Sequence, residues 1–116
     1  MNSITDARRT DAQAVLMEAA QYMERFYTEN NRYDEDTGGT AVALPAQLAE
    51  SPRDSGTKFY DLTVQASSRS TYTLRATPKN GQAGDGFLEI TNTFVKAWDS
   101  DNSGSLIDAE RIWSQH

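Results

Sequence analysis

The chain has 116 residues, the usual size of one domain, and 37% of them are hydrophobic, which is enough to form a single core over residues 1–116. It contains no cysteine, which excludes disulfides, thiolate-bound metals and cysteine nucleophiles. Its 17 Asp and Glu against 11 Lys and Arg give a formal net charge of -6, which argues against a nucleic-acid-binding domain because phosphate binding needs clustered Lys and Arg.

A long amphipathic helix is predicted over about residues 4–30. Neither Gly nor Pro interrupts this segment, and charged and polar side chains occupy its opposite face. Asn30 and Asn31 are expected to end the helix, because Asn tolerates left-handed backbone angles. The apolar residues that recur at helical spacing are Ala12, Val15, Leu16, Ala19, Met23, Phe26 and Tyr27.

A connecting loop is predicted over about residues 31–57. This segment is rich in Gly and Pro and has only a short apolar run, in which Leu44 and Leu48 are expected to hold the loop against the core. A loop of this length is uncommon inside a compact domain. It is therefore either a recognition surface or a segment whose regular structure the pattern does not reveal.

An antiparallel sheet is predicted over about residues 58–98, because apolar and polar residues alternate there. Turn-forming residues at 80–86 separate its first half from its second. A helix followed by consecutive antiparallel strands is the α+β pattern, in which the helix covers one face of the sheet. Four strands are expected, at residues 59–67, 71–77, 87–91 and 94–98.

The C-terminal loop, about residues 99–116, contains a twelve-residue pattern typical of calcium loops, with oxygen side chains at positions 1, 3 and 5, Gly at 6 and Glu at 12. Calcium binds oxygen ligands, and Gly104 allows the sharp turn that would bring them together. The alternative is a surface loop held by its own hydrogen bonds without metal. The candidate calcium ligands are Asp99, Asp101, Ser103, Ser105 and Glu110.

No catalytic residues are predicted. His116 is the only histidine and stands at the C-terminus, so neither a Ser-His-Asp triad nor a three-His zinc site can be formed. The glycines between Gly81 and Gly86 lack the Lys-Ser pair of a phosphate-binding loop. We therefore do not expect an enzyme.

Nearly the whole chain up to Trp98 resembles type IV pilins, particularly PilE-like minor pilins of Gram-negative bacteria. The runs RRTDAQ at residues 8–13 and TYTLRATP at residues 71–78 carry this resemblance. It implies a pilin-like α-β roll, with one long N-terminal helix packed on a four-stranded antiparallel sheet. It also implies an N-terminally truncated soluble domain, in which the apolar half-helix that would contact the membrane is absent before Met1.

The resemblance further implies a structural subunit of a type IV pilus, an extracellular filament for adhesion, motility or DNA uptake. The expected partners are other pilin subunits and the pilus assembly machinery, and no nucleic acid is directly indicated. Before assembly the subunit would stand at the inner membrane, facing the periplasm. The alternatives are a pseudopilin of a type II secretion system and a small calcium-binding module.

The family usually closes its C-terminal region with a disulfide, and Phe87 and Trp113 occupy roughly the places of the two cysteines. Related secretion pseudopilins hold this region with a calcium ion. The resemblance therefore favours a calcium ion bound by the loop from Asp99 to Glu110. Calcium would be the chain's one cofactor.

Overall fold

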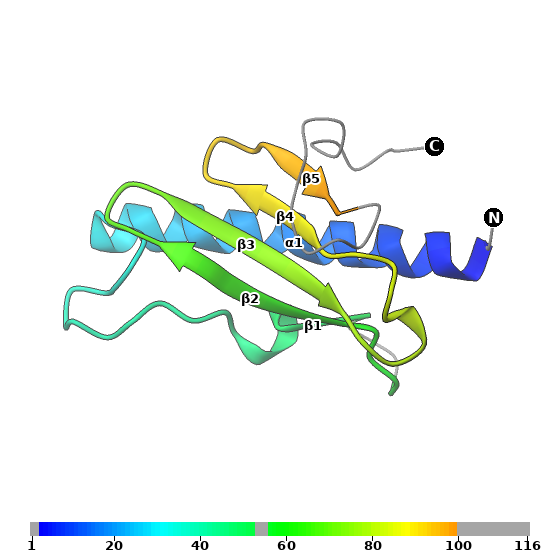
Figure 1. The fold of residues 1–116 in the computed structure, drawn as a ribbon. Helices are drawn as coiled ribbons and strands as arrows, with labels where there is room; N and C mark the ends of the chain where they lie inside the picture. The colour runs from blue at the N-terminus through cyan, green and yellow to red at the C-terminus, as the bar shows by residue number, and fades with distance from the viewer. Residues whose placement is uncertain (1–2, 53–55, 100–116) are drawn as a thin grey trace.

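A computed structural model of the chain describes residues 3–52 and 56–99. In it, helix α1 (Ser3–Asn30) lies across one face of a five-stranded antiparallel sheet whose strands neighbour one another in chain order (Figure 1). This confirms the predicted α+β architecture. The strands are β1 (Glu50–Ser51), β2 (Tyr60–Ser67), β3 (Tyr72–Pro78), β4 (Leu88–Thr91) and β5 (Lys96–Trp98), and two short 3-10 helices are η1 (Ala46–Leu48) and η2 (Asn80–Gln82).

The predicted number of four strands is wrong, because the segment expected to be a loop contributes β1. In this strand Glu50 pairs with Asp61 of β2, and Ser51 pairs with Tyr60. A strand of two residues is too short to show the alternation by which strands are found in a sequence. The last strand also begins later than expected, at Lys96, because the residues before it form a turn.

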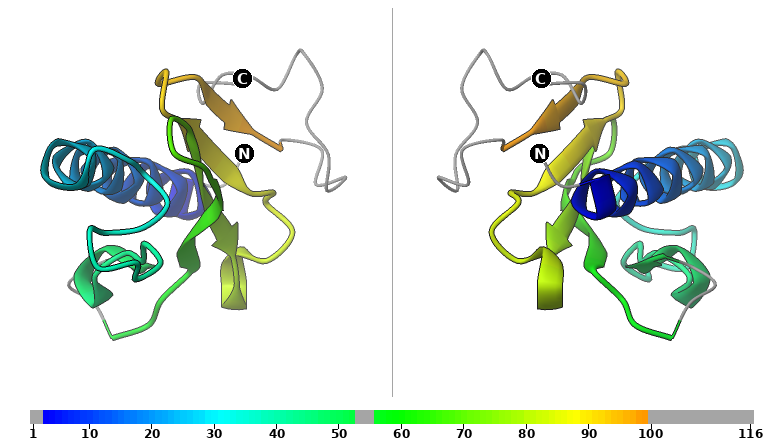
Figure 2. Two further views of the ribbon diagram at one scale, coloured as in Figure 1. Left: turned by 90° about the vertical axis from the view of Figure 1, so that its left-hand side faces the viewer. Right: turned by 90° about the vertical axis from the view of Figure 1, so that its right-hand side faces the viewer.

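Helix α1 lies against one face of the sheet, as Figure 2 shows in views close to the helix axis, and its apolar residues form part of the buried core. The helix ends as predicted: Asn31 has a φ of 60°, and its amide donates to the carbonyl of Tyr27 at 2.7 Å. Within the described residues, no helix combines the length and the apolar character that a membrane span requires. The helix residues of the buried core are Ala12, Val15, Leu16, Ala19, Ala20 and Met23.

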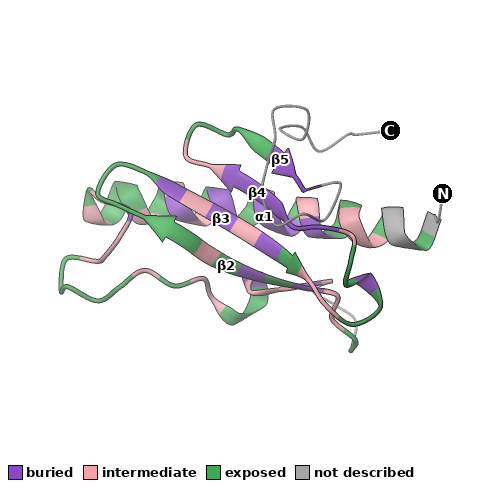
Figure 3. Ribbon diagram, viewed as in Figure 1, coloured by how far each residue is buried: buried purple, intermediate pink, exposed green. Residues whose placement is uncertain are grey.

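The core lies between α1 and the inner face of β2, β3 and β4 (Figure 3). Buried residues alternate with more exposed ones in β3 and at the start of β2, whereas the first three residues of β4 are all buried. The loop is held to this core as expected, since Leu48 is buried and Leu44 packs against the core. On the outer face, Arg75 forms an ion pair of 2.7 Å with Glu89, directly across the β3–β4 ladder. The core residues of the sheet are Tyr60, Leu62, Tyr72, Leu74, Ala76, Leu88, Ile90 and Trp98.

Candidate functional site

The predicted calcium loop falls almost entirely outside the described residues. Of its five candidate ligands only Asp99 is described, and the other four lie beyond the described ranges: Asp101, Ser103, Ser105 and Glu110. Asp99 is buried, and its amide donates to the carbonyl of Phe87 at 2.9 Å. Residues 3–52 and 56–99 bring together no group of three or more His, Cys, Asp or Glu that could hold a metal ion. Calcium binding therefore stays a prediction.

This prediction has a direct thermal test. If calcium organises the loop, saturating calcium is expected to raise the melting temperature above that measured in EDTA, because a ligand at 100 times its Kd stabilises the folded state by about 2.7 kcal/mol. Glu110→Ala should abolish the difference, and magnesium should not reproduce it. Superimposable melting curves in calcium and EDTA would reject the metal site.

Two turns lie side by side at the end of the sheet near the C-terminus of α1: residues 68–71 between β2 and β3, and residues 92–95 between β4 and β5 (Figures 1 and 2). Asn92 links them, because its amide donates to the carbonyl of Tyr72 at 3.2 Å and its side-chain oxygen accepts from the amide of Tyr72 at 3.4 Å. We call these two turns, together with Lys96, the tip surface.

The tip surface contains no carboxylate, although the whole chain is acidic. Its sequences are SRST at residues 68–71 and NTFVK at residues 92–96. Arg69 and Lys96 are both exposed. Four other described cations form ion pairs with carboxylates of the chain: Arg9 with Asp85, Arg32 with Asp34 and Glu35, Arg75 with Glu89, and Lys79 with Glu50 and Asp61. The tip surface thus contributes two cations and no carboxylate to a molecule of net negative charge.

Hydrogen bonds within each turn hold the tip surface in one shape. In the first turn the hydroxyls of Ser68 and Thr71 are 2.5 Å apart, and the amide of Ser68 donates to the carbonyl of Thr71 at 2.9 Å. In the second turn the hydroxyls of Thr91 and Thr93 are 3.0 Å apart. Hydroxyls, amides, Arg and Lys are the groups with which proteins contact phosphates. The tip surface therefore presents side chains of the types that contact phosphates.

Two tyrosines fasten this end of the molecule to α1. The hydroxyls of Tyr33 and Tyr72 donate to the carboxylate of Glu24, at 3.1 and 3.3 Å, and the amide of Tyr33 donates to the carbonyl of Arg69 at 3.2 Å. Burial, and then the hydrogen bond to Glu24, raise the pKa of Tyr33 to about 12. Burial also raises the pKa of Tyr72. Both phenols therefore stay protonated donors at physiological pH, and the tip is held on the helix.

Sequence reasoning missed the tip surface because its two cations are far apart in the chain, at positions 69 and 96. Neither lies in a run of basic residues, so no local pattern indicates them. The only signal available is that 68–71 and 92–96 are free of carboxylates in a chain with 17 of them. This signal becomes meaningful once the strand order puts the two turns next to each other.

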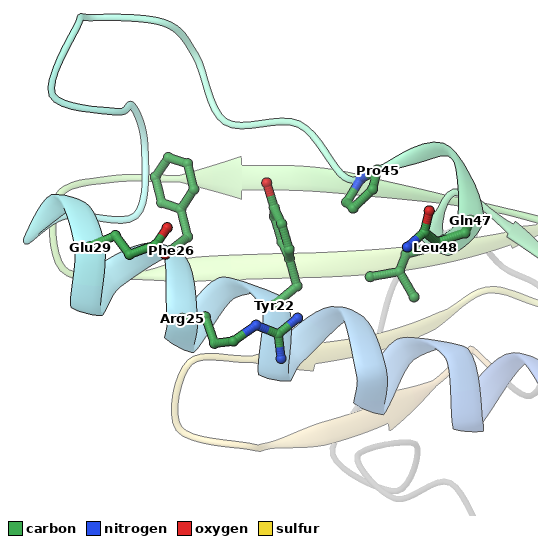
Figure 4. Close-up of a pocket in the computed structure, with 7 residues that line it drawn as sticks. All are labelled: Tyr22, Arg25, Phe26, Glu29, Pro45, Gln47 and Leu48. Atoms are coloured by element: carbon green, nitrogen blue, oxygen red, sulfur yellow. The ribbon is translucent and has the colours of Figure 1, made fainter.

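A second surface feature is a groove of about 340 Å³ between α1 and η1 (Figure 4). The rings of Tyr22 and Phe26 line it, with centroids 6.3 Å apart, and Leu48 lines it from η1. Arg25 and Glu29, one helical turn apart, give it one positive and one negative group. This balanced charge distinguishes the groove from the tip surface.

Comparison with known proteins shows the family and the fold. Residues 1–89 match a family model described as "Type IV minor pilin ComP, DNA uptake sequence receptor". The crystal structure of the non-core minor pilin PilV of Neisseria meningitidis has the same fold, with a TM-score of 0.63 and 17% identity over 93% of this chain and 98% of that chain. A search of curated proteins found no match. The family match includes Arg69 and ends before the turn at 92–95.

Proposed function

The chain belongs to the ComP family of type IV minor pilins, and from this premise we propose that it is a pilus subunit whose tip surface binds double-stranded DNA during DNA uptake. The family match carries this proposal, because it spans α1 and the sheet as far as β4. The carboxylate-free tip surface supplies the chemistry that the proposal needs.

The position of the tip surface suits a subunit that is anchored at one end. The helix begins at the opposite end of the molecule from the two turns (Figure 1). A helix of 28 residues is about 42 Å long at 1.5 Å per residue. If the subunit joins the filament through the beginning of α1, as the pilin fold implies, the tip surface stays free to reach DNA.

Electrostatics limit how such a surface can bind. The net charge of -6 repels a polyanion at long range, so attraction has to come from short-range contacts with the tip surface. Arg69 and Lys96 can neutralise two phosphates, and each neutralised phosphate contributes about -0.9 to the slope of log Kobs against log salt. We therefore expect a slope of about -2 and non-specific dissociation constants of about 10⁻⁶ to 10⁻⁴ M.

Fluorescence anisotropy with a labelled duplex of about 20 base pairs tests the proposal. The double variant Arg69→Ala/Lys96→Ala is expected to bind at least about 10-fold more weakly, with a nearly flat salt dependence, because it has lost both phosphate contacts. Arg25→Ala is the matched control, since Arg25 is an exposed arginine that lines the groove and not the tip surface. Its affinity should stay within about twofold of wild type.

Two results would contradict the proposal. One is the absence of any duplex binding by the wild-type chain at low salt. The other is an equal loss in the double variant and in Arg25→Ala, which would indicate a diffuse charge effect. Adhesion, motility or a place in a secretion pseudopilus are competing roles for the same fold, and none of them requires duplex binding by the tip surface.

A further inference from the structure

We propose that Phe94 is an apolar wedge that inserts between adjacent base pairs of the bound duplex. This inference rests on the proposed DNA-binding function and adds to it a specific mode of contact. It starts from the conformation of Phe94, which the phosphate chemistry of the tip surface does not explain.

Phe94 has a φ of 60°, in the left-handed region that glycine and asparagine adopt readily and aromatic residues rarely adopt. The turn enforces this conformation from both sides. The amide of Phe94 donates to the carbonyl of Thr91 at 2.8 Å, and the amide of Thr91 donates to the carbonyl of Val95 at 3.1 Å. The amide of Val95 donates a third hydrogen bond, to the hydroxyl of Thr91 at 3.2 Å. Strained residues held so firmly are concentrated at functional sites.

The side chain of Phe94 makes no contribution to the core that would offset this strain. Phe94 is 46% exposed, and the adjacent Val95 is 44% exposed, whereas β5 directly after them buries Ala97 and Trp98. The hydrogen-bonded turn already fixes the backbone that carries this exposed apolar pair, so little backbone freedom is lost when the pair enters a partner.

The surroundings of Phe94 favour DNA over a protein as that partner. Lys96 follows two residues later, Arg69 lies on the neighbouring turn, and apart from Val95 the remaining tip residues are Ser, Thr and Asn. Protein interfaces usually surround such an anchor with apolar neighbours and have few charges at their centre. Proteins that wedge DNA open combine an inserted Phe, Leu, Ile or Met with polar and cationic contacts to the backbone beside it. The tip surface has this second arrangement.

The wedge also predicts where along the duplex the tip surface binds. Pyrimidine–purine steps such as TA and CA/TG unstack and kink more easily than other steps. Inserting a ring therefore costs least at these steps. We expect the tip surface to prefer duplexes that contain a pyrimidine–purine step over duplexes of the same composition that lack one.

Duplexes carrying 2-aminopurine at a TA step test the wedge, because this base fluoresces more strongly when it is unstacked. Wild-type protein and Phe94→Trp should raise the fluorescence at saturating protein. Phe94→Asn removes the ring and keeps a residue suited to the left-handed conformation, so it should melt at the wild-type temperature or above. It should nevertheless bind about 10-fold more weakly, with no rise in fluorescence.

The possible failures are distinguishable. If Phe94→Asn binds as wild type does and fluorescence stays constant, while Arg69→Ala still weakens binding, the wedge is wrong and DNA binding by the tip surface stands. If no variant or wild-type protein binds the duplex, both proposals are wrong. If Phe94→Asn weakens binding without any change in the wild-type fluorescence signal, Phe94 contacts the DNA surface and does not insert.

Discussion

Replacing Asp85 by alanine is expected to lower the free energy of unfolding by about 3 kcal/mol, because it removes a largely buried, doubly hydrogen-bonded ion pair. The carboxylate of Asp85 accepts two hydrogen bonds from Arg9, from Nε at 2.8 Å and Nη2 at 3.0 Å. Only 15% of the Asp85 side chain and 14% of the Arg9 side chain are exposed. The same carboxylate accepts hydrogen bonds from the side-chain amide of Gln82 at 3.2 Å and from the hydroxyl of Tyr60 at 3.3 Å.

These contacts join the first half of α1 to the sheet. The guanidinium of Arg9 lies 3.9 Å from the ring centroid of Trp98, and the indole N–H of Trp98 donates to the carbonyl of Asp85 at 2.7 Å. One residue of the β3–β4 loop thus connects the helix, β2 and the end of β5. Its loss should affect the whole fold and not one loop.

Thermal unfolding followed by circular dichroism measures this effect, and a loss of about 3 kcal/mol corresponds to a fall in melting temperature of about 10 °C or more for a domain of this size. Asp61→Ala is the matched control. It removes the same charge from an ion pair of 2.7 Å with Lys79, but the Asp61 side chain is 52% exposed. Asp61→Ala should lower the free energy of unfolding by less than about 1 kcal/mol. Equal melting temperatures for the two variants would contradict the role assigned to Asp85.

The helix and most of the sheet could be predicted from the sequence because their patterns are long. Apolar spacing between Ala12 and Tyr27 indicates one helical face, and strict alternation in β2 and β3 indicates two strands buried on one side. The pairing of Glu50 and Ser51 with β2 depends on where a distant strand lies, so two residues could not indicate it. The sequence predicts a strand that begins at Phe94, but the hydrogen bonds of Phe94 and Val95 with Thr91 form a turn, so that β5 begins at Lys96.

The candidate site was less predictable than the fold. A calcium loop is a continuous pattern and can be recognised in a sequence, whereas the tip surface exists only when β3 and β4 bring two turns together. The net charge of -6 describes the chain as a whole, and it does not show how charges are distributed around Arg69 and Lys96. Local charge depends on topology, and composition does not report topology.

Reversing the charge at Arg69 is expected to reduce DNA uptake by the pilus by about 10-fold or more, because Arg69→Glu removes one phosphate contact and adds a repulsive carboxylate to the tip surface. The side chain of Arg69 is exposed, so folding should be preserved. Arg25→Glu changes the net charge by the same amount on the groove side of α1, and serves as the matched control. Any general effect of charge on the approach of DNA would appear equally in both variants.

The most direct test of DNA binding by the tip surface is therefore the uptake of labelled double-stranded DNA per piliated cell, in bacteria that carry wild type, Arg69→Glu or Arg25→Glu. We expect equal numbers of pili in the three strains and a loss of uptake in Arg69→Glu alone. Wild-type uptake by Arg69→Glu cells with normal pili would contradict it, and so would an equal loss in both variants.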